Sequence, residues 1–284
     1  MKLYLRHQIL IFAALLFVGS IFTGAATASP KKTLIIAGTG ASLGTMELIA
    51  KSFQKKHPNV NVKVLPSIGS TGGIKAVQEG KIDIGLSSRP LKPEERSAEI
   101  IEEPYGRTAF IFGVQDSNPA KGFTLAEIEE IYTGKRKTWP DGAPIRLILR
   151  PLSDAYSVYL ASINPGLKSA SEKAHSIPGI FVGNTDQEAA MQIEKTPGSF
   201  GTLSNSIIAV EKRKIKVLSI DGVAPTVSNV SASKYPYAMT LSLVYKRDKY
   251  RGAIKDFIEF VFSRAGQKIL SNNSYVTLQR ITGK

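Results

Sequence analysis

Residues 34–89 read LIIAGTGASLGTMELIAKSFQKKHPNVNVKVLPSIGSTGGIKAVQEGKIDIGLSSR. Three short apolar runs, at 34–37, 60–65 and 82–86, each end in a turn rich in glycine or hydroxyl residues. Helix-like patterns follow the first two turns. Such strand–turn–helix units aim unpaired backbone N–H groups and the positive end of the helix dipole at one spot. The stretch therefore predicts an anion site at the carboxyl edge of a parallel sheet.

Residues 1–28 have the pattern of a secretory signal peptide. Lys2 and Arg6 are followed by a mostly apolar run over 9–22 and by a small-residue cleavage pattern at 26–28. The apolar run is short for a membrane span and is interrupted by small and polar residues, which disfavours an anchor. The chain has no cysteine, hence no disulfide, thiol nucleophile or lipidated cysteine. We expect a periplasmic protein without a lipid anchor.

The chain is basic, with 37 Lys and Arg against 23 Asp and Glu and a net charge of +14. Its basic clusters, at 135–137 and 212–214, have little aromatic interleaving, so they favour solvated surfaces over a nucleic-acid interface. The charge can raise the capture rate of a small anion. No metal-ligand spacing, P-loop or complete dinucleotide fingerprint is present in the sequence. We therefore expect neither a metal nor a cofactor.

The order of elements predicts an α/β fold. Strand and helix patterns alternate over 34–86, as in a parallel sheet covered by helices. Capping boxes begin helices at Thr124 and Thr185, a strand is expected over 215–220, and a single amphipathic helix is expected over 250–270. The apolar, β-rich pattern stops at the polar residues 115–119, QDSNP. We therefore expect the middle of the chain to be an insertion between two halves of one lobe. The expected parts are a signal peptide (1–28), lobe 1 (29–114 and 238–284) and lobe 2 (115–237), with a two-segment hinge.

Four stretches carry a resemblance to a known family. They are the turn at Gly40–Ser42, the sequence GSTGGIK at 69–75, the sequence DIGLSSR at 83–89, and the block LAEIEEIYTGK at 125–135 with WPDG at 139–142. The last of these is the most specific. The chain resembles the phosphate-binding proteins of Pst-type ABC importers, which have the two-lobed type II periplasmic binding protein fold.

The resemblance implies a function and its partners. It implies a non-catalytic exported receptor that binds an inorganic oxyanion, with phosphate as the expected ligand, in a cleft between two mostly parallel, helix-flanked lobes. The receptor would be a monomer and would deliver its ligand to an ABC permease in the inner membrane. The alternatives are a sensor or accessory protein for another oxyanion or an organic anion.

The resemblance also implies the site residues. The family's first-lobe ligands match Ser42, Leu43, Ser70, Thr71 and Ser88. Its second-lobe arginine matches Arg150, but Asp154-Ala155-Tyr156 stands where the family has a Ser-Gly-Thr turn. Asp154 has two readings: it accepts a hydrogen bond from a protonated oxyanion, or it is the N-cap of its helix. Arg150 ends a buried-type strand, so its charge needs a partner, which is the oxyanion, a structural pair with Asp154, or both.

One motif competes with this interpretation. Residues 40–44, GASLG, match the nucleophile elbow of a serine hydrolase, with Ser42 as the nucleophile. A hydrolase triad also needs a histidine, and neither His57 nor His175 is expected at a strand end. The sequence therefore favours a binding protein over an enzyme.

Overall fold

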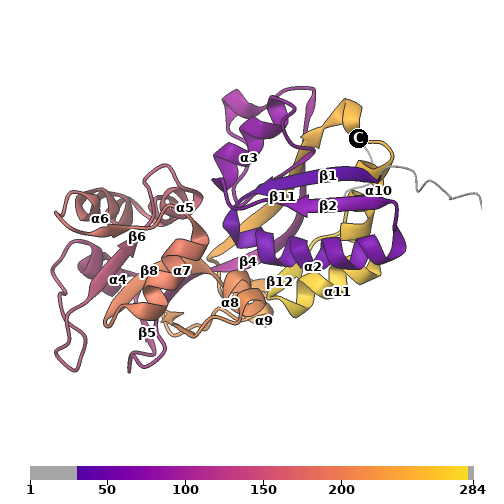
Figure 1. The fold of residues 1–284 in the computed structure, drawn as a ribbon. Helices are drawn as coiled ribbons and strands as arrows, with labels where there is room; N and C mark the ends of the chain where they lie inside the picture. Colours follow the sequence, from indigo (N-terminus) through magenta and orange to yellow (C-terminus); the bar gives the residue numbers. More distant parts are fainter. Residues whose placement is uncertain (1–30, 281–284) are drawn as a thin grey trace, which may run out of the picture. The chain divides into compact units, whose positions relative to one another are not determined.

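The computed structural model describes residues 31–280, and within them the chain forms one compact unit from Lys32. The predicted signal peptide, residues 1–28, lies outside the described residues. A ten-stranded sheet runs in the order β2–β1–β3–β11–β4–β8–β6–β7, with β9 and β12 each paired to β4 (Figure 1). Its strands are β1 (Lys32–Gly38), β2 (Val60–Val64), β3 (Ile84–Ser87), β4 (Ile100–Gln115), β6 (Arg146–Leu149), β7 (Phe181–Val182), β8 (Ser199–Ser204), β9 (Ile215–Val217), β11 (Ala238–Lys246) and β12 (Tyr275–Thr277). A separate two-stranded sheet contains β5 (Gly122–Phe123) and β10 (Ser219–Ile220).

Two groups of parallel strands make up most of the large sheet. In the first group β1 pairs with β2 and β3, and in the second group β6 pairs with β7 and β8. Antiparallel β11 and β4 join the groups, since β4 pairs with β11 up to Ala109 and with β8 from Phe110 onward. This arrangement confirms the predicted α/β class with two mostly parallel halves. The proposed lobe boundaries at 114/115 and 237/238 stay a prediction.

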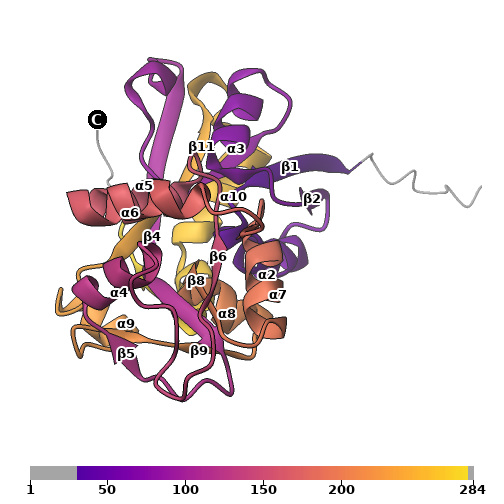
Figure 2. The same ribbon diagram turned by 90° about the vertical axis from the view of Figure 1, so that its left-hand side faces the viewer.

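Ten α-helices flank these strands in the described residues. They are α2 (Gly40–Lys56), α3 (Gly69–Gln78), α4 (Leu125–Tyr132), α5 (Ala155–Ile163), α6 (Pro165–His175), α7 (Asp186–Lys195), α8 (Asn205–Glu211), α9 (Val227–Ser231), α10 (Ala253–Phe262) and α11 (Arg264–Asn272). Helices α2, α10 and α11 pack together beside the first strand group, whereas α5 and α6 pack against each other beside the second (Figures 1 and 2). No helix of the described part is both long and apolar enough to cross a membrane.

The predicted capping residues begin both helices. At α4, the Thr124 hydroxyl accepts from the Glu127 N–H and the Glu127 carboxylate accepts from the Thr124 N–H, which is the predicted capping box. At α7, the Thr185 hydroxyl accepts from the Glu188 N–H, but the Glu188 carboxylate accepts from the N–H of Asn184 at 2.8 Å. The reciprocal bond therefore reaches one residue further back than predicted.

Two predicted elements are each divided in the structure. The helix expected over 250–270 is wrong as a single helix: Ser263 is extended, ends α10 and caps α11 by accepting from the Gly266 N–H. The strand expected over 215–220 is also wrong as a single strand, because β9 pairs with β4 while β10 pairs with β5. In both places the local pattern continues, and tertiary contacts decide where the element ends.

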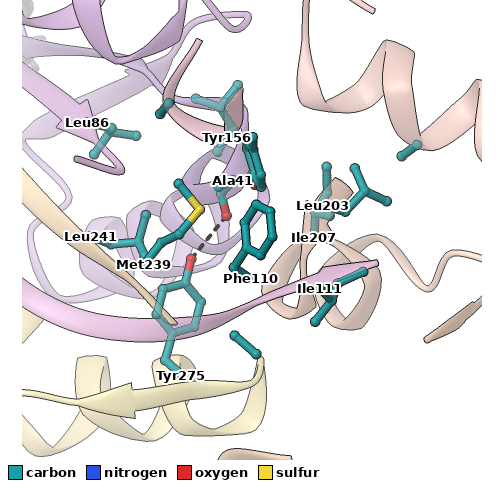
Figure 3. Packing of buried hydrophobic residues seen from close by; sticks show 14 of the residues in the cluster. Ala41, Leu86, Phe110, Ile111, Tyr156, Leu203, Ile207, Met239, Leu241 and Tyr275 are labelled. Atoms are coloured by element: carbon teal, nitrogen blue, oxygen red, sulfur yellow. Dashed lines mark hydrogen bonds between the residues drawn. The ribbon is translucent and has the colours of Figure 1, made fainter. Parts of the chain in front are cut away.

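Buried tyrosines fix the start of α2. The Tyr275 hydroxyl donates to the Ala41 carbonyl at 3.2 Å (Figure 3), and the Tyr105 hydroxyl donates to the Ser42 hydroxyl at 2.8 Å. Both tyrosines are fully buried in the large apolar core. The first turn of α2 is therefore held from β4 and β12, which keeps its N–H groups in a fixed direction at the edge of the sheet.

Candidate functional site

Three buried hydroxyls meet at the carboxyl ends of β1 and β3. The Ser88 hydroxyl lies 3.1 Å from that of Thr39 and 3.2 Å from that of Ser70. The Ser88 N–H also donates to the Ser70 hydroxyl at 3.0 Å. Because β1 and β3 are adjacent parallel strands, their ends share one edge of the sheet, as the sequence predicted. We call Thr39, Ser70 and Ser88 the hydroxyl cluster.

A cavity of about 330 Å³ lies next to the hydroxyl cluster. It is lined by Ser67, Ile68, Gly69, Ser70, Thr71, Pro151, Ser153, Asp154, Ala155, Asn184 and Thr185. The N-terminal ends of α3, α5 and α7 therefore border the same cavity. Each end presents N–H groups and a partial positive charge, and three ends around one space favour an anion there.

Arg150 lies directly after β6 and is 3% exposed. Its Nε and Nη2 donate to the Asp154 carboxylate at 3.2 and 3.0 Å, and its Nη1 donates to the Gly183 carbonyl at 2.9 Å. A second carboxylate, that of Asp186, lies 3.6 Å from Nη2. We call Arg150, Asp154 and Asp186 the Arg150 trio.

The two carboxylates of this trio differ in their surroundings. Asp154 also caps α5, since its Oδ1 accepts from the Tyr156 N–H at 3.0 Å. Asp154 therefore has both of the structural roles that the sequence predicts for it: it caps α5 and it pairs with Arg150. Asp186 is 2% exposed, and burial raises the pKa of its carboxyl, opposed by the positive charge of Arg150 and reinforced by the negative charge of Asp154.

The structure brings most of the predicted site residues together. Ser70, Thr71 and Asp154 line the cavity, Ser88 is bonded to Ser70, and Arg150 is bonded to Asp154. The structure shows that these residues lie together at the cavity, and their contact with a ligand stays a prediction.

Two predicted residues lie elsewhere. The hydroxyl of Ser42 is fully buried and already accepts from Tyr105. Leu43 lines a different cavity, of about 660 Å³, which α2 borders. Their roles as ligand residues also stay predictions, and for Ser42 the backbone is the part of the residue that such a role requires.

Sequence reasoning missed Thr39 and Asp186. Thr39 is the N-cap residue of α2, and a threonine before a glycine-rich helix start is a local signal for a cap. Asp186 has no such signal, because its partner Arg150 lies on another element. Arg89, the residue after Ser88, is 8% exposed and paired with Glu95.

This arrangement suits a small oxyanion. Hydroxyls and helix N-termini donate hydrogen bonds to an anion without requiring a metal, and no cluster of potential metal-binding side chains occurs within residues 31–280. The fold and the site together define a binding protein of the periplasmic type.

A family model described as a PBP superfamily domain matches residues 23–265, so the chain belongs to the PBP superfamily. The phosphate-binding protein PstS of Bacillus subtilis is 27% identical over 252 residues, covering 86% of this chain and 80% of that protein. Protein SphX of Synechococcus elongatus is 27% identical over 266 residues, covering 84% and 76%.

Solved structures give the same class. A Clostridium perfringens protein, described as a phosphate ABC transporter substrate-binding protein and solved with bound phosphate, has a TM-score of 0.78 and 26% identity. The match covers 87% of this chain and all of that one. PstS and the Clostridium perfringens protein are described as binding proteins, so the class is a receptor and not an enzyme, and the hydrolase alternative based on Ser42 falls away.

Proposed function

We propose that the chain is an exported phosphate receptor that delivers phosphate to an ABC permease in the inner membrane. The observation that carries this proposal is the meeting of the hydroxyl cluster and the starts of α3, α5 and α7 at one cavity. Phosphate has several oxygens that accept hydrogen bonds, and helix N-termini with serine and threonine hydroxyls supply the donors. The similarity to PstS of Bacillus subtilis supports phosphate as the ligand.

The proposed site contains residues from both halves of the sheet. The Ser70 and Thr71 side chains contact the ligand, and Thr39 and Ser88 orient the Ser70 hydroxyl. At the start of α2, Ser42 and Leu43 contribute backbone groups to the site. From the second half, Arg150 lies behind the starts of α5 and α7, where it is paired with Asp154. Ligand bound to both halves favours the closed state of a hinge between lobe 1 (29–114 and 238–284) and lobe 2 (115–237).

The same proposal includes the location and the partners. Residues 1–28 direct export, and the mature receptor acts in the periplasm as a monomer without a lipid anchor. The positive charge of the chain, +14 over its full length, raises the rate at which the receptor captures an anion at low salt.

A thermal-shift panel tests this function. The protein is stripped of ligand by unfolding and refolding, then heated with phosphate, arsenate, sulfate, tungstate or citrate. Phosphate at a hundredfold excess over its dissociation constant adds about 2.7 kcal/mol to the free energy of unfolding. We expect a rise in Tm with phosphate and arsenate but not with sulfate. No rise with any anion would contradict the proposal.

A matched pair of variants tests whether phosphate binds at this cavity. Ser70→Ala removes a hydroxyl at the cavity and is expected to reduce the phosphate-dependent rise in Tm. Ser271→Ala removes an exposed hydroxyl of α11, which bonds only to the Lys268 carbonyl in the described structure, and is expected to leave the rise unchanged. Equal responses of the two variants would place the binding site elsewhere.

A further inference from the structure

A second cavity, of about 610 Å³, lies beside the second strand group and is bordered by α4, β6, β7 and α7. It shares no lining residue with the cavity next to the hydroxyl cluster. Helix α7 reaches from one to the other, since its N-cap Thr185 lines the first cavity and its C-cap Thr196 lines the second. The ten residues of α7 put about 15 Å between these two ends. We call the second space the apolar cavity.

The apolar cavity lies where the edge strand of the sheet stops. Strand β6 has four residues, but β7 pairs only with its last two, Ile148 and Leu149. The first two, Arg146 and Leu147, have no strand beside them on the β7 side in the described structure, and both line the cavity. The short β7 therefore leaves part of the edge of β6 uncovered.

Apolar side chains make up much of the lining and are only partly buried. They are Ile145, Leu147, Ile177, Ile180 and Phe181. Ile177 is 45% exposed, and the other four are half-buried against the core. Because the removal of apolar surface from water is favourable, this lining favours a ligand with a hydrocarbon part.

Every charged side chain in the lining of the apolar cavity is positive. These side chains are Arg136, Lys137 and Arg146. Arg136 is bonded to Glu127 at 2.9 Å, whereas Lys137 and Arg146 make no ion pair within residues 31–280. Arg146 donates to the Pro197 carbonyl. Two cations without a carboxylate partner therefore border an apolar space.

The ends of two helices oppose this positive charge only in part. The last turns of α4 and α7 bring partial negative charge to the apolar cavity, since Ile131 and Thr196 line it. A helix end carries about half an elementary charge, whereas Lys137 and Arg146 each carry a full one. On balance the apolar cavity favours an anionic group.

We propose that the apolar cavity binds a single-chain anionic amphiphile. The hydrocarbon tail lies on the apolar side chains, and a carboxylate head lies at Lys137 and Arg146. A fatty acid has this chemistry, because it joins one apolar chain to one anionic head. The second ligand site goes beyond the proposed function and does not depend on it.

A fluorescence titration with dodecanoate, kept below its micelle concentration, tests the assignment. Trp139, the one tryptophan of the sequence, is buried in the loop between Lys137 and Pro144, both of which line the apolar cavity. We therefore expect dodecanoate to change its emission in a saturable way. Octanoate has the same head and a shorter tail, and it is expected to bind about tenfold more weakly or worse. Dodecyltrimethylammonium has a cationic head on a similar tail, and we expect the same loss for it.

Two variants change the apolar cavity at exposed positions. The double variant Lys137→Gln with Arg146→Gln removes the charge at the head and is expected to weaken dodecanoate binding about tenfold. Ile177→Asp places a carboxylate among the apolar side chains and is expected to weaken binding further. Val227→Asp is the control, because Val227 is a 36% exposed residue of α9 outside the lining, and it should keep the wild-type affinity.

Four results would overturn the assignment. Equal dodecanoate affinity in Ile177→Asp and Val227→Asp would place the amphiphile elsewhere. Equal affinity of the wild type for dodecanoate and dodecyltrimethylammonium would leave the cations without a role. The assignment also fails if the wild type binds no amphiphile, or if it is a dimer that Ile177→Asp makes monomeric, since a second copy of the chain would then fill the cavity.

The double variant guards against a fold defect in Ile177→Asp. If Ile177→Asp lacks a cooperative thermal transition, wild-type dodecanoate affinity in Lys137→Gln with Arg146→Gln overturns the assignment by itself. Phosphate binding is measured separately in the thermal-shift panel, so failure of the proposed function would leave this second site standing.

Discussion

Arg89 and Glu95 form a buried ion pair beside the site. The two Nη atoms of Arg89 donate to the Glu95 carboxylate at 2.7 and 2.6 Å, and Nη2 also donates to the Thr71 hydroxyl at 2.9 Å. The Arg89 side chain is 8% exposed and that of Glu95 is 12% exposed. The pair therefore positions Thr71 at the rim of the cavity, and its strength depends on Glu95 remaining ionised.

Glu95→Gln is expected to destabilise the protein by roughly 3 kcal/mol at neutral pH, because it leaves Arg89 buried without a counter-charge. Burial raises the pKa of Glu95, but hydrogen bonds from Arg89 and the Lys92 N–H outweigh burial and lower it. A lowered pKa adds stability above the unfolded value of about 4.5, and this stability is lost as the pH falls through the folded value.

Urea unfolding at several pH values measures this effect. The stability gap between wild type and Glu95→Gln should narrow as the pH drops below about 5. Glu79→Gln is the control, because Glu79 pairs only with exposed lysines in the described structure and should change stability little. A gap that widens in acid, or no gap at neutral pH, would show that the pair is not stabilising.

At the residue scale, local patterns predicted one side of the site better than the other. Ser88 follows β3 directly, and Ser70 and Thr71 lie in the first turn of α3, the helix that follows β2, so the turn signals were enough to place them at one edge. The pairing of Arg150 with Asp154 was also predicted, because a charge at the end of a buried strand needs a partner. Asp186 was not predicted, because its contacts with Arg150 and Gly40 join segments far apart in the chain.

At the element scale, the start of α7 packs onto the start of α2. The Gln187 amide donates to the Gly40 carbonyl at 3.3 Å, and Asp186 lies against the Gly40 Cα, where a side chain would collide. Gly40 therefore permits the contact between two helices that start in different halves of the sheet.

Gly40→Ala tests this contact. A methyl group there would lie 2.5 Å from the Asp186 Oδ2, so we expect a loss of about 1–3 kcal/mol in the free energy of unfolding. In the matched control, Gly72→Ala in α3, the new methyl group would be 3.1 Å from the Cβ of the exposed Ile68, a contact that a shift of a few tenths of an ångström relieves. Alanine favours helix there by up to about 1 kcal/mol, so the control should be near neutral. Equal stabilities in urea unfolding would contradict the packing described for Gly40.

Element ends were harder to predict than element types. The apolar pattern over 250–270 continues across the break at Ser263, since both α10 and α11 bury one face. The apolar pattern over 215–220 likewise continues where the pairing strand changes from β4, which pairs with β9, to β5, which pairs with β10. The spacing of apolar residues indicates which face of an element is buried, but it does not indicate where one element ends and the next begins when both bury a face.

At the scale of the whole molecule, β4 and β11 connect two parallel strand groups into one sheet. The alternation of strands and helices predicted this class, because each parallel crossover requires a helix between strands. The helix starts of both groups then surround a single cavity. Closure of a hinge around that cavity is the proposed means by which a ligand changes the state of the receptor.

A crystal structure of the ligand-stripped protein soaked with phosphate tests the central claim most directly. We predict phosphate in the cavity bordered by α3, α5 and α7, within hydrogen-bond distance of the Ser70 and Thr71 hydroxyls. Phosphate bound in the cavity that contains Leu43, or at no defined position, would contradict the account.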